Sequence, residues 1–558
     1  MLVNLKEQLQ ASINEALEPL FSSGQPCPAV DLEIPNDKQH GEFATNIALK
    51  SARILRKKPI DIAHDFCAAI QGHIDSGPLK EKVSRIEVKN PGFINFYLSH
   101  NAVYDILYQV FEQQEEYGRT SFGQGKKLQL EFVSANPTGP LSVAHARQAA
   151  VGDALANILN FSGFNAQKEY YVNDEGNQIN ILGRSIQCRA RQVLGEDCEF
   201  PEEGYQGDYI RDMARDFIEK NNIENLDVLN QKNLEDFSQY GVDFLLSVIK
   251  KELDDFGVHF DVWAHQSRIA TQDQIDTLLA EMKEQGHLYD KDGALWFKSV
   301  PYGDDKDRVV RKSDGSYTYF TPDIVYHKDK FQRGVDEAVN IWGPDHHGYI
   351  PRLTAAVEAL GQKREALKVL IVQLATIYRN GEPVSMSTRR GQYISLREVM
   401  DEVGVDAARF FFLMRHIKAH LDFDLELAKK ETSENPVYYI QYAHARIYSI
   451  VEKAKKEDLS EKTKDLNLLI EAEELDLIKK IGSFSDILEI CCREMDPYAL
   501  TAYLHELATC FHRFYDRHRV VDANNSDLSS ERLALIDSAR IVIANGLRLL
   551  GVSQPNKM

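Results

Sequence analysis

A strand-like segment, a short loop with two prolines and a helical segment follow one another directly from Lys127, and this order constrains the fold more than any other feature. Leu128 to Val133 predicts a strand, residues 143 to about 159 predict a helix, and Lys168 to Val172 predicts a second strand. Strands that alternate with helices build parallel sheets. We therefore predict that an α/β domain with a parallel sheet opens here.

Three later segments are also strand-like and are interpreted as further strands of this domain: Ala294 to Phe297, Ala338 to Trp342 and Val369 to Val372. The residues from about 176 to 285 are mainly charged amphipathic helix and carry no recognisable chemistry. We interpret them as a helical insertion between two halves of the sheet. The whole unit is predicted to span residues 120–400.

Residues 1–100 predict a separate α+β domain. Met1 to Phe21 and Ala44 to Leu55 have helical patterns, and Val83 to Tyr97 alternates like a strand except where Asn90-Pro91-Gly92 interrupts it. The first helix is amphipathic and is therefore expected to belong to the fold rather than to a secretory signal.

After about Glu398 the chain is predicted to be helical to its end, so residues 401–558 form a third, all-α domain. Asn435-Pro436 and Asp496-Pro497 mark two helix starts there, because a capping residue precedes a proline in the first turn. No internal repeat is evident in the sequence.

The composition is that of a globular protein with roughly three or four domains, since 558 residues exceed what one core supports. Hydrophobic residues make up 43% and charged residues 27% of the chain, and no apolar run approaches the length of a membrane span. The seven cysteines include no Cys-x-x-Cys pair. This favours a reducing, cytoplasmic compartment and argues against a structural zinc site.

The formal net charge of −20 argues, taken alone, against a polyanionic partner. Two local clusters are basic despite the negative net charge. Lys50 to Lys58 is a basic run without an acidic member, and Phe511 to Val520 holds three arginines against Asp516 alone. Each cluster is either a solvated helix face or part of a nucleic-acid surface.

The loop after Val133 is the expected place for a phosphate ligand. Ligands of open α/β sheets bind at the carboxyl ends of strands, where a helix N-terminus presents free N–H groups. The alternative is an ordinary strand-to-helix crossover without a ligand. The predicted phosphate-binding segment is Ala135, Asn136, Pro137, Thr138, Gly139, Pro140, Leu141, Ser142, Val143, Ala144 and His145. The family resemblance described next implies that its ligand is ATP, and we call it the ATP-binding segment.

The segment from Asn136 to Asp153 (NPTGPLSVAHARQAAVGD) resembles the HIGH-signature region of bacterial arginyl-tRNA synthetases, which belong to class I. Other stretches resemble the family in the same order along the chain, so that the resemblance covers nearly all of it. These are GEFATNIAL at 41–49, YYVNDEGNQ at 170–178, SYTYFTPDIVYH at 316–327, WGPDHHGYIPR at 342–352, VSMSTRR at 384–390, NPVYYIQYAHA at 435–445 and ANGLRLLGVSQPNKM at 544–558.

Two departures from the family pattern concern the catalytic signatures. Ser142 stands where the first histidine of the His-x-x-His pair is expected, and Ala144 replaces the usual glycine. The second signature, KMSK in most class I synthetases, reads Ser385, Met386, Ser387 and Thr388, without either lysine. We expect Arg389 or its neighbour Arg390 to supply the positive charge near the leaving pyrophosphate, because arginine is always protonated.

The resemblance also implies an arginine pocket, and its chemistry can be checked against the residues. A planar guanidinium needs fixed, ideally paired acceptors. The implied arginine-binding set is Tyr319 and Asp323 after the strand-like Ser316 to Phe320, with Glu131, Asn136 and His347. The alternatives are that Tyr319 is a half-buried strand aromatic and that Asp323 caps a helix after Pro322.

The resemblance implies a Rossmann-like catalytic domain, an N-terminal domain that contacts the tRNA elbow and a C-terminal domain that reads the anticodon. Aromatic residues beside basic groups are candidates for anticodon contacts, although most must be core: Tyr438, Tyr439, Tyr442, Phe511, Phe514 and Tyr515. The implied activity is ligation of arginine to its tRNA with ATP and Mg²⁺, by a monomer without a protein-ligated metal.

Three alternatives remain from the sequence. The chain could charge another amino acid, or it could be a non-catalytic tRNA-binding paralogue, as Ser142, Ser385 and Thr388 allow. Asp345-His346-His347 also resembles the manganese site of DHH phosphoesterases. Those enzymes need further aspartates at neighbouring strand ends, and none stands in a matching place.

Overall fold

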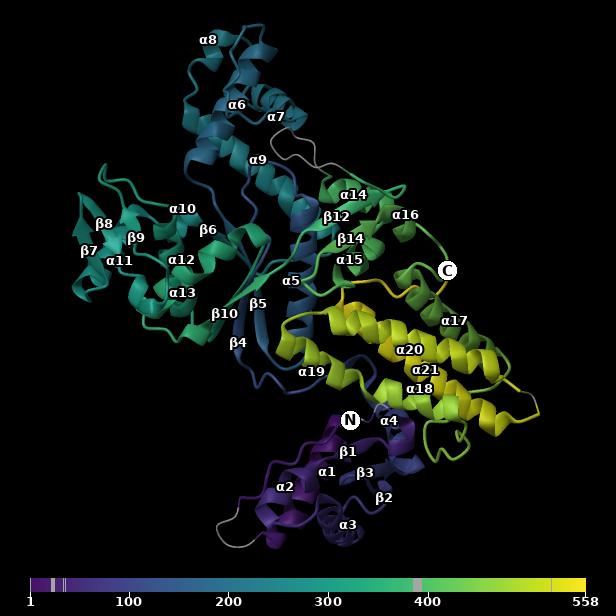
Figure 1. Cartoon of the computed structure of the whole chain (residues 1–558). Helices are drawn as coiled ribbons and strands as arrows, with labels where there is room; N and C mark the ends of the chain where they lie inside the picture. The colour runs from purple at the N-terminus through teal and green to yellow at the C-terminus, as the bar shows by residue number, and fades with distance from the viewer. Residues whose placement is uncertain (1, 22–25, 34, 36, 385–393, 523) are drawn as a thin grey trace.

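The computed structural model describes residues 2–21, 26–33, 35, 37–384, 394–522 and 524–558. Figure 1 shows a central sheet with a helical lobe at one end and a helical bundle beside it, and the N-terminal domain next to the bundle. One hydrophobic core runs from Leu5 in the first helix through the helix of the ATP-binding segment to Val552. None of the described helices is long and apolar enough to cross a membrane.

The central sheet is parallel, as predicted, and its strand order reverses between β4 and β10. In spatial order the strands are β11 (Leu367–Ile371), β10 (Glu337–Trp342), β4 (Lys127–Glu131), β5 (Asn165–Val172) and β6 (Val262–His265). Such a switch point opens a crevice at the carboxyl ends of the strands.

Helix α5 (Val143–Phe161) follows β4 and is buried on nearly all sides. Gly152 permits this packing, because a Cβ atom there would overlap the ring of Phe132, directly after β4. The contact brings the helix close to the sheet.

The N-terminal domain is α+β, as predicted. Its strands form an antiparallel sheet in the order β1-β3-β2, and the interruption at Asn90-Pro91-Gly92 is the turn between two of them. Residues 43–45 form a strand, so the second helix begins later than predicted. The elements are α1 (Leu2–Leu17), β1 (Phe43–Thr45), α2 (Ile47–Leu55), α3 (Pro59–Ser76), β2 (Val83–Lys89), β3 (Phe93–Leu98) and α4 (His100–Gln113).

The predicted insertion at 176–285 is mainly helical, but it contains one strand of the central sheet. The helices before this strand are α6 (Asn177–Val193), α7 (Asp208–Lys220), α8 (Leu226–Leu229) and α9 (Leu234–Asp255). Val262–His265 then forms β6, which pairs in parallel with β5 and belongs to the central sheet. The strand is only four residues long, so its signal is weak, and the stacking of Trp263 on Tyr170 at 4.5 Å holds it in place.

Ala294–Phe297 forms a strand, β8, but not in the central sheet. It lies in a separate antiparallel sheet of the order β7-β8-β9, with β7 at Leu288–Lys291 and β9 at Arg308–Arg311. Asp292 and Gly293 both have positive φ and join β7 to β8. Asp-Gly is a strong signal for a two-residue hairpin, and the interpretation as a strand of the parallel sheet missed it.

This hairpin belongs to a lobe beside the central sheet that also contains α10 (Gln266–Ile269), α11 (Gln272–Glu284), α12 (Phe320–Gln332) and α13 (Ile350–Ala359). The strand-like Ser316 to Phe320 is not a strand; Tyr317 forms only an isolated bridge with Arg311, and α12 begins at Phe320.

Residues 375–384 and 394–428 pack against α5 on one side and against the bundle on the other. Leu421–Asp424 (β14) is a strand in a region predicted to be helical, and it pairs in parallel with β12 (Ala375–Arg379), which also pairs with β13 (Glu382–Pro383). Its alternation of buried Leu421 and Phe423 is a strand pattern too short to stand out. The helices here are α14 (Leu396–Val403), α15 (Val405–Leu413) and α16 (Leu425–Ala428).

The chain ends in the predicted helical bundle: α17 (Pro436–Lys456), α18 (Ala472–Gly482), α19 (Phe484–Glu494), α20 (Tyr498–Arg517) and α21 (Ser526–Leu549). Asn435 caps α17 as predicted, and its side chain accepts from the Val437 amide at 3.2 Å. Asp496 accepts from the Tyr498 amide at 3.0 Å, and Pro497 precedes the first residue of α20 rather than occupying its first turn.

Gly152→Ala is expected to lower the free energy of unfolding by about 1–3 kcal/mol, because the added methyl group overpacks against Phe132. Gly72→Ala in α3 is the matched control, since its Cβ would meet nothing within 4 Å. That change should instead stabilise by about 0.5–1 kcal/mol. Denaturant unfolding of both variants measures the difference, and equal effects would contradict the packing argument.

Candidate active site

A pocket of about 560 Å³ lies at the carboxyl ends of β4 and β10, where the strand order reverses. The end of β4, the first turns of α5 and α12, the end of β10 and residues 343–349 all contribute to its walls. Residues more than 200 positions apart in sequence therefore meet there.

The ATP-binding segment forms one wall. Ala135, Asn136, Ala144 and His145 line the pocket, whereas Leu141 and Val143 are core residues. The remaining positions form the turn and the start of α5. Tyr209 of α7 donates to the Thr138 carbonyl at 2.7 Å, which holds the turn from outside.

His145 is held by the residue that replaces the first signature histidine. Ser142 is the N-cap of α5, and its amide donates to His145 Nδ1 at 3.2 Å, with its Oγ also at 3.2 Å from that atom. Burial lowers the pKa of His145 to about 4, although the charge of Asp345 acts in the opposite direction. The imidazole is therefore neutral near pH 7, and an acceptor at Nδ1 leaves Nε2 as the N–H donor.

The second signature cannot be placed beside the first. Ser385, Met386, Ser387 and Arg389 lie outside the described residues. The chain that follows them does meet the first signature: the Leu396 amide donates to the Leu141 carbonyl at 2.8 Å, and the Val143 amide donates to the Ile394 carbonyl at 3.3 Å. The chain that follows the second signature, from Ile394 on, is thus tied to the start of α5.

Glu131 lies at the end of β4 and is already paired. Its carboxylate forms a buried ion pair with Lys330 of α12 at 2.5 Å, and Lys330 also donates to Asn340 at 3.0 Å. Asn340 in turn donates to His327, whose Nδ1 lies 2.8 Å from the Asp323 carbonyl. This network fixes the floor of the pocket.

Asp323 lies in the first turn of α12 and accepts a hydrogen bond from the Tyr349 hydroxyl. It does not cap the helix, since Tyr319 is the N-cap residue. Burial raises the pKa of Asp323 to about 7, and the charge of Glu131 adds to this, whereas the Tyr349 hydrogen bond and Lys330 act the other way.

Tyr319 and Asn136 lie at the entrance. Tyr319 is 66% exposed, so it is not a half-buried strand aromatic. Asn136 donates to Gln178 of α6 at 2.7 Å. Both line the same pocket as Glu131 and Asp323, so the structure brings these four predicted residues together.

His347 is the predicted arginine-binding residue that the structure does not bring into the pocket. Residues 344–349 form a 3₁₀ helix, in which residues three apart share a face. His346 and Tyr349 therefore line the pocket, while His347 is exposed and lies outside the lining. The spacing that decides this is visible only once the 3₁₀ turn is known.

Models of three protein families match consecutive parts of the chain. Residues 7–98 match the arginyl tRNA synthetase N terminal domain, and residues 106–425 match the catalytic domain of tRNA synthetases class I (R). Residues 440–558 match the DALR anticodon binding domain. The chain belongs to the arginyl-tRNA synthetase family.

Similar proteins cover the full length of the chain. It is 44% identical over 556 residues to arginine–tRNA ligase 1 of Halalkalibacterium halodurans, with 99% of each covered. It is 45% identical over 561 residues to an arginine–tRNA ligase of Geobacter sp. strain M21, with 99% of this chain and 100% of the relative covered. The solved arginyl-tRNA synthetase of Thermus thermophilus has the same fold, with a TM-score of 0.75 at 22% identity, covering 99% and 100% of the two chains.

This family member is an arginine–tRNA ligase, and arginine, ATP and tRNA are its substrates. Family membership therefore settles the choice against another amino acid and against a phosphoesterase. In the part of the chain that the structure describes, no three His, Cys, Asp or Glu side chains gather as metal ligands.

The sequence did not point individually to several residues that line the candidate site or extend its hydrogen-bond network. Tyr349, His327 and Asn340 are all in or near the recognised segments, and Asn340 is a polar residue within an apolar strand. Val133 and Ser134 have positive φ, which turns the chain sharply after β4. Ser134 then donates to Glu131 at 3.2 Å and accepts from the Tyr171 amide at 3.1 Å.

The raised pKa of Asp323 has a consequence for stability. A carboxyl whose pKa is higher in the folded than in the unfolded state contributes stability that is lost as pH rises through the folded pKa. The wild type should therefore lose stability relative to Asp323→Asn between the unfolded pKa of roughly 4 and about 7. Unfolding of both proteins over this pH range measures the effect, and a constant difference would show that Asp323 is not buried as described.

Proposed function

We propose that this pocket binds arginine at Asp323 and ATP at His145, and that the ligase reaction begins between them. The observation that carries the proposal is the placement of Asp323 in the same pocket as His145. Asp323 accepts from Tyr349 but, among the described residues, takes part in no ion pair, whereas Glu131 is paired with Lys330. A cation that enters the pocket thus meets one carboxyl without a cationic partner. Burial raises the pKa of this carboxyl to about 7, and the charge of a bound cation would favour its ionised form.

A guanidinium suits this position better than an ammonium. Its planar fork can bond a carboxylate in two places, and Asp323 is fixed by the Tyr349 hydroxyl. Tyr319 and Asn136, both at the entrance, would hold the rest of the amino acid. Burial of unpaired acceptors would then disfavour lysine or an apolar residue.

In the first step the arginine carboxylate attacks the α-phosphate of ATP, and the bond to the β-phosphate oxygen breaks to release pyrophosphate. In the second step the terminal ribose hydroxyl of tRNA attacks the carbonyl of the arginyl-adenylate, and the bond to the phosphate breaks to release AMP and a proton. Neither step needs a protein nucleophile. His145 Nε2–H and the N-terminus of α5 would stabilise charge that develops on the phosphates. Mg²⁺ would arrive on the phosphates, and Arg389 stays our candidate for a cation near the pyrophosphate.

His145→Ala should reduce arginine-dependent ATP–pyrophosphate exchange, measured with tRNA present, by about 10²- to 10³-fold, because one donor to a developing charge is removed. His347→Ala is the matched control, because that histidine is exposed and outside the pocket. It should leave the exchange rate unchanged. Retained exchange in His145→Ala would contradict the role of His145.

We also propose that the bundle reads the anticodon through a pocket on α17 and α20. It measures about 490 Å³ and is lined by Tyr438, Tyr439, Tyr442 and His512, among others. Tyr438 and Tyr442 are stacked with ring centroids 6.2 Å apart, and Tyr442 is 38% exposed. Unpaired RNA bases stack on such aromatics.

The other aromatic candidates do not offer such a surface. Phe511 and Phe514 are core residues, and the Tyr515 hydroxyl accepts from Arg446 at 2.9 Å. The bundle's aromatic candidates are thus divided between core and surface, as helical spacing leads one to expect.

Tyr442→Ala should raise the KM for tRNA in the charging reaction, since stacking contributes about 1–3 kcal/mol per base. Tyr448→Ala is the control on the same helix, six residues farther along and outside the pocket. Charging kinetics distinguish the two variants. An equal change in KM for both would argue against an anticodon pocket here.

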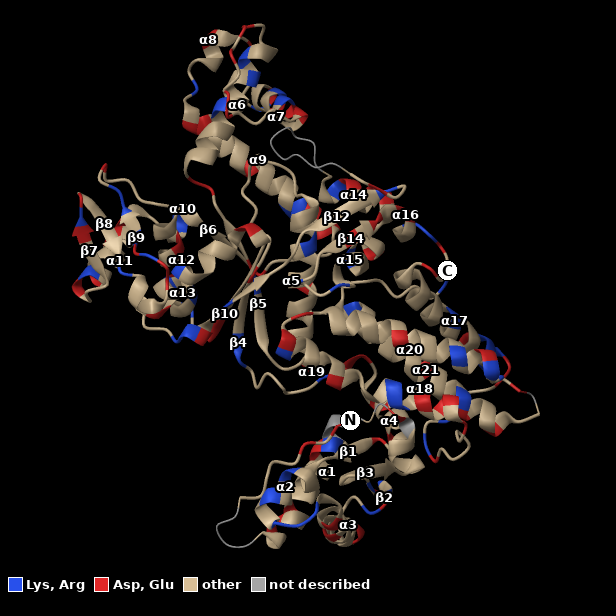
Figure 2. Ribbon diagram, viewed as in Figure 1, with Lys and Arg blue, Asp and Glu red and all other residues tan. Residues whose placement is uncertain are grey.

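The N-terminal domain is proposed to contact the tRNA elbow, and the protein is proposed to act as a cytoplasmic monomer. Figure 2 shows charges of both signs mixed on the N-terminal domain and on the bundle. In the basic run, Lys50 pairs with Asp31, and Lys57 pairs with Asp65 at 2.9 Å. Such exposed pairs contribute little stability, so they can be exchanged for phosphate contacts at small cost.

A further inference from the structure

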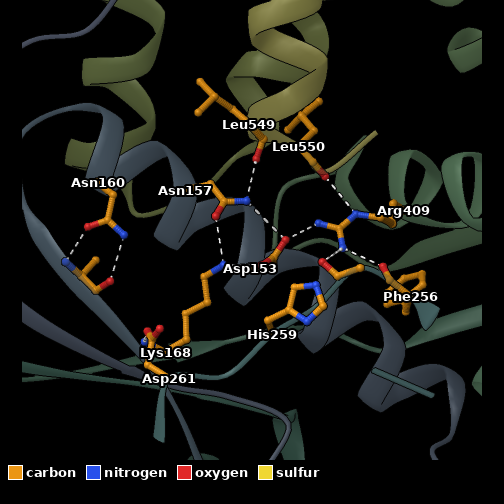
Figure 3. Close-up of polar contacts among 12 residues, drawn as sticks. Asp153, Asn157, Asn160, Lys168, Phe256, His259, Asp261, Arg409, Leu549 and Leu550 are labelled. Atoms are coloured by element: carbon orange, nitrogen blue, oxygen red, sulfur yellow. Dashed lines mark hydrogen bonds and ion pairs between the residues drawn. The ribbon is translucent and has the colours of Figure 1, made fainter. Parts of the chain in front are cut away.

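Arg409 of α15 lies where the helix of the ATP site meets the last helix of the bundle. Its side chain is fully buried and bonded in three directions (Figure 3). Nη1 donates to the Phe256 carbonyl at 2.9 Å, Nε donates to the Leu550 carbonyl at 3.0 Å, and Nη2 pairs with the Asp153 carboxylate.

The carbonyl partners of Arg409 stand at the ends of two helices from different parts of the molecule. Phe256 directly follows α9 of the insertion, and Leu550 directly follows α21 of the bundle. Helix C-termini carry partial negative charge and leave carbonyls without intrahelical donors, so one guanidinium satisfies both ends. Its third partner, Asp153, belongs to α5, whose N-terminus carries His145.

Asp153 is held from two sides, by Arg409 and by Lys168 of β5 at 2.5 Å. Burial alone would raise the pKa of Asp153, but these two positive charges outweigh burial and lower it. The carboxylate therefore stays ionised near neutral pH. Asn157, one turn farther along α5, donates to the Leu549 carbonyl at 3.3 Å, so α5 is bonded to the end of α21 directly as well as through Arg409.

A second buried guanidinium, nearer the ATP site, links α5 to the bundle through the loop at 416–419. Arg147 donates to the carbonyls of Gln373 at 2.7 Å, Ala419 at 3.0 Å and His416 at 3.1 Å. Asp496, next to the start of α20, accepts from the Ile417 amide of the same loop at 3.0 Å. Gln373 also lines the candidate active site. The position of α5 is thus defined by the bundle at two places.

We propose that Arg409 is a positioning residue that couples anticodon binding to arginine activation. It fixes α5 to the end of α21, so that the placement of the bundle on tRNA sets the placement of His145 at the ATP. Close-packed interiors pass on displacements rather than absorb them, and the planar arginine fork bonds Asp153 and both carbonyls at once. The inference rests on the proposed reading of the anticodon by the bundle.

Arg409→Lys tests the coupling, because lysine keeps the charge but cannot bond three partners in fixed directions. Charging kinetics are measured for the wild type and the variant, each with arginine tRNA and with the same tRNA altered in the anticodon. In the wild type, the altered anticodon should raise KM and lower kcat. In the variant, kcat with unaltered tRNA should fall by about 2- to 30-fold, and the altered anticodon should no longer lower kcat further, while its effect on KM remains.

Arg308→Lys is the matched control. Arg308 is only 12% exposed and is bonded twice to Asp304, at 2.7 Å each, but this pair lies within one lobe. It should keep the effect of the anticodon on kcat. Gly551→Ala is a second test variant, to be used if Arg409→Lys does not fold. Its added methyl group would overlap the Arg409 guanidinium from the bundle side and should therefore weaken the coupling.

The proposal is overturned if the anticodon change lowers kcat by the same factor in the wild type and in both Arg409→Lys and Gly551→Ala, because a purely structural defect would reduce all rates alike. It is also overturned if Arg308→Lys loses the effect to the same extent. If the altered anticodon changes neither KM nor kcat of the wild type, both the proposed anticodon reading and the coupling are overturned. If Arg409→Lys loses the effect of the anticodon on kcat but keeps its effect on KM, the coupling is lost while anticodon reading remains, so the two proposals are tested separately.

Discussion

The packing of Gly152 against the ring of Phe132 brings α5 directly onto the central sheet, and much of the structure depends on this contact. A helix buried on nearly all sides must satisfy its few polar side chains internally, because an unpaired buried charge is costly. Arg147 bonds the carbonyls of Gln373, His416 and Ala419, and Asp153 pairs with Lys168 of β5 and with Arg409. The same helix therefore fixes the ATP-binding segment at one end and the bundle along its side.

The candidate site contains two carboxyls with different partners. Glu131 is neutralised inside the floor by Lys330, which orients Asn340 and His327. Asp323 stands above that floor with a hydroxyl partner, and burial raises its pKa to about 7. Because Glu131 is already paired, Asp323 is the carboxyl that a cationic side chain in this pocket would bind. The neutral imidazole of His145 on the facing wall suits phosphate, which needs a donor.

The replacement of the first signature histidine by serine is accommodated by local geometry. Ser142 caps α5 and sets the orientation of His145 through its amide and hydroxyl. The first position of the pair thus contributes to the site by fixing its neighbour. The membership of the chain in the arginyl-tRNA synthetase family accords with this, since its relatives match along the whole length.

Local patterns were enough for the elements whose signals lie within a few residues. The strand, turn and helix from Lys127 to Phe161, the hairpin of the N-terminal domain and the Asn435 cap all follow from spacing and turn chemistry. Three short strands were not assigned correctly, although for β8 the local Asp292-Gly293 turn could have shown the hairpin. For β6, β8 and β14, only the pairing partner decides which sheet a four-residue strand joins, and that partner is distant for β6 and β14.

The sequence by itself determined the family, the order of the domains and the residues Glu131, Asn136, Tyr319, Asp323 and His145 as one candidate set. Collinear motifs carry that information because each is local. Only the tertiary structure decided that His346 and Tyr349, and not His347, line the pocket. It also decided that Glu131 forms an ion pair with Lys330. It also decided that Arg409 joins α5 to the end of α21. These facts depend on which side chains meet across hundreds of residues, and close packing in three dimensions fixes them.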